Sequence, residues 1–310
     1  MSLGWMYVCL SLVGTVYSTQ GHLGPKPRLC SNNPMNPGDF ILESYDGRKL
    51  WATLHLPPVP KGPPIVMAHG LLGFKDWAFF PFVAESLAAA GFPVVRFNFS
   101  GSGMAGHADG PFTDLTGFEN DTITRQVEDL HSVISAIRAG RVPGLEASDR
   151  VFLWGHSRGG GVAILTAVRD PAVSALALWA PISRVNRYSV ERVRAWRRRG
   201  YDVLESSRTG QALKSSVVFL DDVEKWAREG DVPVQLFRLK APRLLVHGNE
   251  DKSVPPEESE SLAAVAPGTR LAILAGADHK FNSSHPFDGP SPQLAEALAV
   301  TTAFYLEFAL

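Results

Sequence analysis

Short apolar runs alternate with longer stretches of helical character along most of the chain. The apolar runs lie at 65–68, 94–97, 151–154, 175–179, 244–246 and 271–274. The stretches expected to form helices lie at 77–90, 122–139, 159–168, 257–265 and 293–308. Strands that are apolar along their whole length are expected where helices cover both faces of a parallel sheet. The pattern therefore predicts an α/β fold with a doubly wound, mostly parallel sheet.

Two segments depart from this alternation. The apolar runs 40–42 and 50–54 flank the turn residues Asp46 and Gly47, which predicts an antiparallel hairpin that opens the sheet. Residues 183–240 contain no apolar strand and are dense in Arg, Glu, Asp and scattered aromatic residues. We interpret this segment as a helical cap insertion over one end of the sheet. The expected organisation is one α/β domain at 39–310, with the cap at about 183–240.

The first 38 residues have a different character. Residues 3–17 are mostly apolar and uncharged, and 16–18 resemble a signal-peptidase site, but no Lys or Arg precedes the apolar run. The run is also short for a membrane span. Residues 1–38 are expected to be an N-terminal extension or a signal segment, ending in a linker rich in Pro, Gly and Asn. We expect a cytoplasmic protein, or a secreted one if residues 1–18 are a cleaved signal peptide.

Composition narrows the classes of partner. The 310 residues have a formal net charge of −1, which gives no electrostatic reason to expect binding to nucleic acid. Two cysteines make neither a disulfide framework nor a zinc site, and the nine histidines lack the spacing of metal ligands. No metal or cofactor is implied. We expect a small-molecule substrate, and the sequence does not indicate the oligomeric state.

A G-x-S-x-G pentapeptide occupies residues 155–159, directly after an apolar run and directly before a predicted helix. In such a tight turn the residues two before and two after the serine must be small, and Gly155 and Gly159 meet this requirement. The turn should raise Ser157 Oγ above the sheet, where the N-terminus of the following helix favours developing negative charge. Ser157 is therefore the candidate nucleophile.

A serine hydroxyl needs a base to accept its proton. His279 follows the last predicted strand, in a loop on the same edge of the sheet as Ser157. Asp251 follows the preceding strand, and the chain order serine, acid, histidine is the one expected for this architecture. His279 is the candidate general base, and Asp251 the group that holds its imidazole in the required tautomer. Glu250 and Asp278 are the competing carboxylates.

Two backbone N–H groups are candidates for binding an oxyanion. One belongs to Arg158, the residue after the nucleophile. The other should come from the loop that follows the run 65–68, where Gly70 frees the backbone to turn. We expect Leu71 to supply this second N–H group, with Leu72 as the alternative.

These motifs together resemble the α/β-hydrolase superfamily. The His69-Gly70 turn, G-x-S-x-G, a G-x-x-D segment ending at Asp251 and the pair Asp278-His279 occur in that order. The runs 73–77 and 96–101 are similar to capped bacterial-type esterases and the serine aminopeptidase-like hydrolases grouped with them. The resemblance covers about residues 39–310. It implies a cofactor-free hydrolase that passes through an acyl-enzyme, and it does not fix the substrate.

Three functions are compatible with these residues. The first is hydrolysis of a carboxylic ester. The second is an aminopeptidase or amidase, which would need cap carboxylates such as Glu205, Asp221 or Asp222 to bind a substrate ammonium group. The third is a catalytically silent binding protein on the same fold, although such proteins usually lack a member of the triad. We favour the esterase.

Other patterns in the sequence have simpler interpretations. Residues 101–106 match the dinucleotide-binding pattern G-x-G-x-x-G, but no helix can open within them, so we interpret them as a loop at the rim of the cleft. Five arginines at 192–199 are interpreted as a solvated helix face balanced by nearby acids. Most aromatic residues near 74–80 and in the cap are expected in the core, with one or two lining an apolar pocket.

Overall fold

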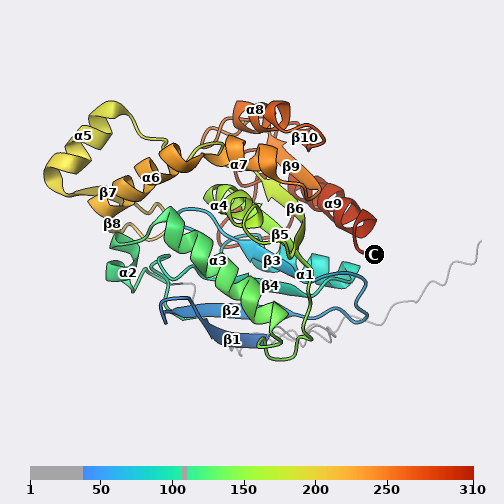
Figure 1. Ribbon diagram of the computed structural model, residues 1–310. Helices are drawn as coiled ribbons and strands as arrows, with labels where there is room; N and C mark the ends of the chain where they lie inside the picture. Colours follow the sequence, from blue (N-terminus) through green and yellow to red (C-terminus); the bar gives the residue numbers. More distant parts are fainter. Residues whose placement is uncertain (1–37, 107–109) are drawn as a thin grey trace, which may run out of the picture. The chain divides into compact units, whose positions relative to one another are not determined.

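The centre of the domain is a sheet of eight strands in the computed structural model, which describes residues 38–106 and 110–310 (Figure 1). In chain order the strands are β1 (Gly38–Glu43), β2 (Lys49–His55), β3 (Ile65–Ala68), β4 (Val94–Phe97), β5 (Val151–His156), β6 (Val173–Trp179), β9 (Arg243–Gly248) and β10 (Arg270–Leu274). They lie in the order β1-β2-β4-β3-β5-β6-β9-β10. The first two pairings, β1 with β2 and β2 with β4, are antiparallel, and all the others are parallel. The predicted mostly parallel sheet with an opening hairpin is confirmed.

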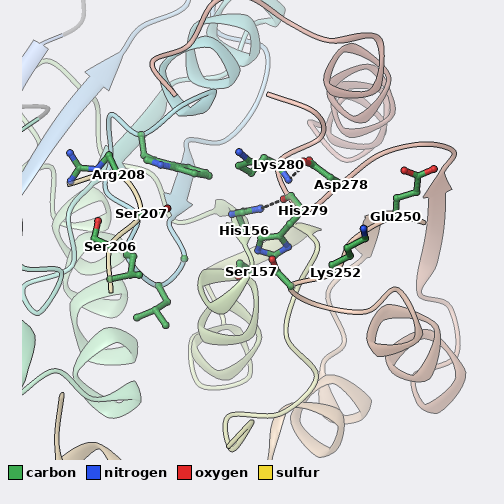
Figure 2. A pocket seen from close by; sticks show the side chains of 16 residues that line it. His156, Ser157, Ser206, Ser207, Arg208, Glu250, Lys252, Asp278, His279 and Lys280 are labelled. Carbon is green, nitrogen blue, oxygen red and sulfur yellow. Dashed lines mark hydrogen bonds between the residues drawn. The ribbon is translucent and has the colours of Figure 1, made fainter. Parts of the chain in front are cut away.

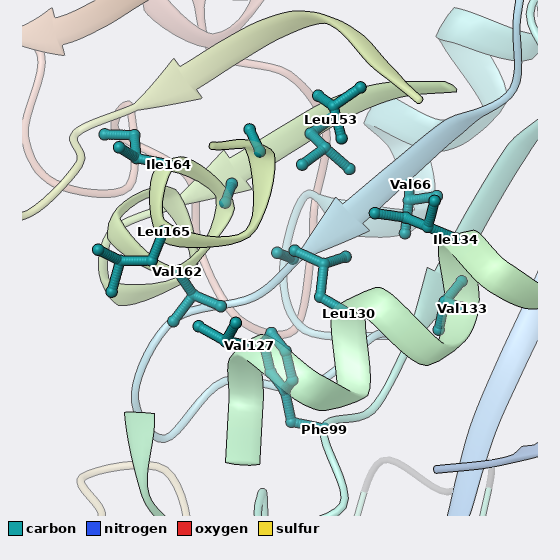
Figure 3. Packing of buried hydrophobic residues seen from close by; sticks show 14 of the residues in the cluster. Val66, Phe99, Val127, Leu130, Val133, Ile134, Leu153, Val162, Ile164 and Leu165 are labelled. Carbon is teal, nitrogen blue, oxygen red and sulfur yellow. The ribbon is translucent and has the colours of Figure 1, made fainter. Parts of the chain in front are cut away.

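Helices cover both faces of this sheet, as the apolar strands require. The helices outside the segment 183–240 are α1 (Phe80–Ala90), α2 (Leu115–Glu119), α3 (Ile123–Arg138), α4 (Arg158–Ala167), α8 (Glu257–Val265) and α9 (Pro292–Glu307). Neighbouring residues of one strand point to opposite faces, so they enter different cores. Val66 and Leu153 pack with α3 and α4 in one cluster (Figure 3), whereas Ile65 and Phe152 pack with α1 and α9 in the other.

The first helix begins at Phe80 rather than at the predicted Trp77. The reason is local, because Ala78 has a φ of 45°, which no α-helical residue adopts. Pro81 then occupies the first turn of α1, where its missing N–H group costs no hydrogen bond. As a result Trp77 lies on a connecting segment, and its side chain is available to line a cavity.

The segment between β6 and β9 contains the predicted helices and also a small hairpin that the sequence pattern did not indicate. Its elements are α5 (Val190–Arg199), β7 (Tyr201–Glu205), β8 (Ala212–Ser216), α6 (Val217–Glu229) and α7 (Val232–Arg238). The strands β7 and β8 pair only with each other in the described structure. The hairpin escaped prediction because each strand is five residues long and charged residues, at Asp202, Glu205 and Lys214, leave no apolar run of strand length.

Acidic side chains pair with three of the five arginines of α5, which are Arg192, Arg197 and Arg199. Arg192 donates to Asp202, and Arg197 donates to both Asp221 and Glu224. None of the helices at 38–106 and 110–310 combines the length and the apolar character needed to cross a membrane. The proposed N-terminal extension, apart from Gly38, lies outside the described residues, so its nature stays a prediction.

Candidate active site

Ser157 lies on a sharp turn between β5 and α4. Its backbone angles, φ 58° and ψ −123°, are strained for a residue with a side chain, and such strain persists only when the surroundings impose it. A Cβ atom at Gly155 would lie 2.7 Å from the carbonyl oxygen of Gly159, and one at Gly159 would lie 2.3 Å from that of Ala68. The two glycines therefore allow the close packing that the turn requires, as the pentapeptide predicted.

We expect Gly159→Ala to destabilise the fold by about 1–3 kcal/mol, because the new methyl group meets rigid backbone rather than a movable side chain. The free energy of unfolding from urea titration measures this effect. Gly38→Ala is the matched control, since its Cβ would lie 4.0 Å from the Leu54 carbonyl oxygen, an ordinary contact. The control should change stability by less than about 0.5 kcal/mol. Equal stability of the two variants would contradict this packing argument.

His279 and Asp251 meet at the carboxyl edge of the sheet. Asp251 follows β9, His279 follows β10, and the distance from His279 Nδ1 to Asp251 Oδ2 is 2.6 Å. The other carboxylate oxygen accepts hydrogen bonds from the N–H groups of Ser253 and Val254 at 2.8 and 2.9 Å. Since a carboxylate only accepts, the proton of a neutral His279 lies on Nδ1, and Nε2 is left as the basic atom.

The environment keeps Asp251 ionised. Burial alone would raise its pKa, but hydrogen bonds from His247, His279 and the Val254 N–H group outweigh burial and hold the pKa of this carboxyl well below its usual range. His247 is itself completely buried, with Nε2 3.2 Å from Asp251 Oδ2 and Nδ1 2.7 Å from Ser259 Oγ. A fixed negative charge therefore lies directly behind the His279 ring.

Neither competing carboxylate contacts the His279 imidazole within the described part of the chain. Asp278 Oδ1 accepts hydrogen bonds from the N–H groups of Lys280 and Asn282, both at 2.8 Å, so it caps the turn that carries His279. Glu250 is exposed at the mouth of the cavity. Asp251 is the carboxylate that the fold brings to the ring.

The loop after β3 passes directly beside Ser157. A Cβ atom at Gly70 would lie 2.9 Å from the Cβ and 3.4 Å from the Oγ of Ser157, so only a glycine allows this approach. His69 holds the loop, since its Nδ1 donates to the Gly70 carbonyl at 2.9 Å and its Nε2 accepts from the Phe99 N–H group at 3.2 Å. Burial lowers the pKa of His69 to about 4, which keeps the ring neutral.

Leu71 and Leu72 continue this loop, and both line the cavity. Their positions therefore do not distinguish between the two N–H groups as the second oxyanion donor. Arg158 is the first residue of α4, and the N–H groups of a first helical turn have no partner within the helix. The predicted oxyanion donors thus lie on the two segments that flank the Ser157 hydroxyl.

Ser157 and His279 line the same cavity of about 480 Å³ (Figure 2). Leu71, Leu72 and Trp77 give it an apolar wall, and its other side chains are polar or carry charges of both signs. The turn between β7 and β8 adds Ser206, Ser207 and Arg208. The sequence analysis missed these three residues, because nothing in their local pattern marks a hairpin turn that reaches the cavity.

Trp77 is the aromatic residue of the 74–80 segment that lines the cavity, whereas Phe74, Phe79 and Phe80 are buried in the core. Within the described ranges, no three His, Cys, Asp or Glu side chains are grouped so as to hold a metal ion. A hydroxyl and an imidazole with a basic nitrogen therefore line one cavity, and a fixed carboxylate is hydrogen bonded to the imidazole.

Residues 63–231 match the family model described as serine aminopeptidase S33, a family of α/β hydrolases. The chain belongs to this family. Along the sequence, this hydrolase is 31% identical over 156 residues to the quorum-quenching protein AidA of Acinetobacter baumannii (strain MDR-ZJ06). That match covers 49% of this hydrolase and 46% of AidA, so the chain spans about half the length of this curated relative.

Solved structures show the same fold at low sequence identity. Est1E from Butyrivibrio proteoclasticus has a TM-score of 0.62 at 20% identity, covering 87% of this chain and 98% of Est1E. DcsB, solved in complex with its substrate analogue, has a TM-score of 0.67 at 20% identity, covering 88% of this hydrolase and all of the DcsB chain. The protein therefore has the α/β-hydrolase fold.

Proposed function

We propose that this hydrolase cleaves carboxylic esters through an acyl-enzyme formed on Ser157. The observation that carries the proposal is the 2.6 Å contact between His279 and Asp251 at the cavity that Ser157 lines. This contact orients the imidazole and leaves Nε2 as its basic atom. A strained nucleophile turn beside a glycine loop supports the same reaction.

In the acylation half, Ser157 Oγ attacks the ester carbonyl carbon while its proton passes to His279 Nε2. The resulting oxyanion is held by the N–H groups of Arg158 and Leu71. The Asp251 carboxylate stabilises the imidazolium. When the tetrahedral intermediate collapses, the bond to the alcohol oxygen breaks, and that oxygen takes the proton from His279 Nε2. The acyl group then remains on Oγ.

In the deacylation half, water attacks the acyl carbon and gives one proton to His279 Nε2. The same N–H groups hold the second oxyanion. Collapse breaks the bond between the acyl carbon and Ser157 Oγ, and the proton returns from His279 to Oγ. The products are a carboxylic acid, an alcohol and the free enzyme, and no cofactor takes part in these steps.

Aminopeptidase or amidase activity on the same residues is the second candidate, and the description of the matched family favours it. The cap acids expected to bind an ammonium group do not line the cavity. Asp221 pairs with Arg197, Asp222 accepts from the Thr124 N–H group at 2.9 Å, and Glu205 is exposed on β7. The three cap acids are therefore not placed to bind an ammonium group at the cavity, where the carboxylates are those of Glu250 and Asp278.

Matched substrates separate these candidates. We expect turnover of p-nitrophenyl acetate, butyrate and octanoate, and kcat/KM for aminoacyl p-nitroanilides lower by about 100-fold or more. An aminopeptidase would also prefer a free amino group, so each anilide is compared with its N-acetylated form. A strong preference for the free-amine anilide would replace the esterase by the aminopeptidase. Absence of Ser157 labelling by a fluorophosphonate would instead favour a binding protein.

A further inference from the structure

His156, the residue immediately before the proposed nucleophile, contacts the backbone of the proposed base. Its Nε2 lies 2.8 Å from the carbonyl oxygen of His279, the contact drawn as a dashed line in Figure 2. A carbonyl oxygen can only accept, so Nε2 carries a proton and donates it. The side chain is 3% exposed, and burial lowers the pKa of His156 to about 3, which keeps the ring neutral. The neutral ring therefore still donates through Nε2 at neutral pH.

Aromatic rings fix the orientation of this donor. The Trp77 ring is stacked on His156 with centroids 6.1 Å apart, and Phe79 and Phe80 meet it edge-on at 5.5 and 6.2 Å. The His279 ring lies 4.8 Å away. Close packing of this kind restricts rotation of the imidazole, so its Nε2–H bond stays directed at the His279 carbonyl.

The same aromatic segment also contacts the loop beyond His279. The N–H group of Ala78 donates to His285 Nδ1 at 3.0 Å, and the His285 ring is stacked on Trp77 with centroids 6.3 Å apart. His279 and His285 thus attach one loop to the segment 77–80 and to the end of β5. Within this loop, His156 makes its contact at the residue whose imidazole is the proposed base.

We propose that His156 is a positioning residue, which sets the imidazole of His279 relative to Ser157 through the hydrogen bond to the His279 carbonyl. His156 and Ser157 are consecutive on one strained turn, so this bond ties the base to the backbone that carries the nucleophile. The inference rests on the proposed function. Displacement of a reacting group by about 1 Å can cost on the order of 100-fold in rate, which sets the scale of the expected effect.

Two substitutions of His156 separate the hydrogen bond from the packing. His156→Leu keeps an apolar side chain of similar size and removes the donor, whereas His156→Gln retains a side-chain N–H group near the position of Nε2. We expect His156→Leu to lower kcat by about 10- to 100-fold with KM changed by less than about threefold. His156→Gln should recover kcat to within about fivefold of the wild type.

Each kcat is measured on p-nitrophenyl butyrate and divided by the fraction of protein that a fluorophosphonate labels at completion, so unfolded molecules are not counted. His55→Leu is the matched control, because His55 is a buried histidine on β2 that accepts a hydrogen bond from Arg96 at 2.9 Å, outside the cavity. It should lower the melting temperature and leave kcat per labelled molecule within about twofold.

Three outcomes would overturn the positioning role of His156. These are an unchanged kcat in His156→Leu, equal losses in the Leu and Gln variants, or a loss that appears only in KM. Ser157→Ala, measured in parallel, tests the proposed function separately. If Ser157→Ala is inactive while His156→Leu is fully active, the esterase proposal stands and only the positioning role fails.

Discussion

Replacing Ser157 by alanine is expected to lower kcat for ester hydrolysis by about 10⁴- to 10⁶-fold. Without Oγ no acyl-enzyme forms, and only direct attack by water, aided by the oxyanion donors, remains. The fold should be retained, because alanine at a φ of 58° is no more strained than the serine it replaces. Steady-state hydrolysis of p-nitrophenyl butyrate, with the melting temperature measured alongside, tests both statements.

The matched control for this variant is Ser132→Ala. Ser132 lies in α3, where its Oγ donates to the Glu128 carbonyl at 2.8 Å within the same helix. This substitution also removes one hydroxyl, and kcat should stay within about twofold of the wild type. If Ser157→Ala keeps more than about a tenth of the wild-type kcat in a preparation free of contaminating esterase, Ser157 is not the nucleophile.

Replacing Asp251 by asparagine is expected to lower kcat by about 10⁴-fold. The side chain keeps its size, but its amide group no longer imposes a proton on His279 Nδ1. The imidazole can then place its proton on Nε2, where it cannot accept one from Ser157. The negative charge that stabilises the imidazolium is also lost. Hydrolysis of p-nitrophenyl butyrate at neutral pH measures the combined effect.

Two further variants test the assignment of the acid. Asp278→Asn and Glu250→Gln should each lower kcat by less than about tenfold, because neither carboxylate is hydrogen bonded to the imidazole in the described structure. A loss of about 10⁴-fold in either variant, with Asp251→Asn nearly unaffected, would reassign the acid.

Stability provides an independent check on Asp251. The pKa of its carboxyl is lowered on folding from the ordinary value of 3.8, so ionised Asp251 stabilises the fold above that pH. This contribution is lost as the pH falls through the folded-state pKa. Asp251→Asn should therefore be less stable than the wild type at neutral pH. The difference between the free energies of unfolding of the two proteins should become smaller below about pH 3.8. A constant difference would contradict the lowered pKa.

Much of the fold could be predicted because its signals are local. Apolar runs such as 151–154 and 244–246 mark buried strands wherever helices cover both faces of a sheet, and the helices between them followed from their length and periodicity. The start of α1 was misplaced, because periodicity does not register a single residue such as Ala78 in a left-handed conformation. The β7–β8 hairpin was missed for a related reason, since its strands have no apolar run to mark them.

The sharp turn at Ser157 could also be predicted from the sequence alone. A glycine two residues before and two after Ser157 is a steric requirement of the turn itself, so the pentapeptide has a recognisable pattern. For the acid, chain order favoured Asp251, but Glu250 and Asp278 stayed as competitors. Glu250, Asp251 and Asp278 all lie within or beside the correct loops, and loop sequences do not specify which carboxylate will face an imidazole.

The amino-acid sequence by itself determined the fold class, the sharp turn at Ser157, and the loops from which a base and an acid could come. Each of these depends on residues that are neighbours along the chain. Only the tertiary structure decided which side chains meet. It brought Asp251 to His279 across 28 positions of sequence and His156 to the same residue across 123. Contacts of this range arise from how strands pair and loops fold back, and no local pattern encodes them.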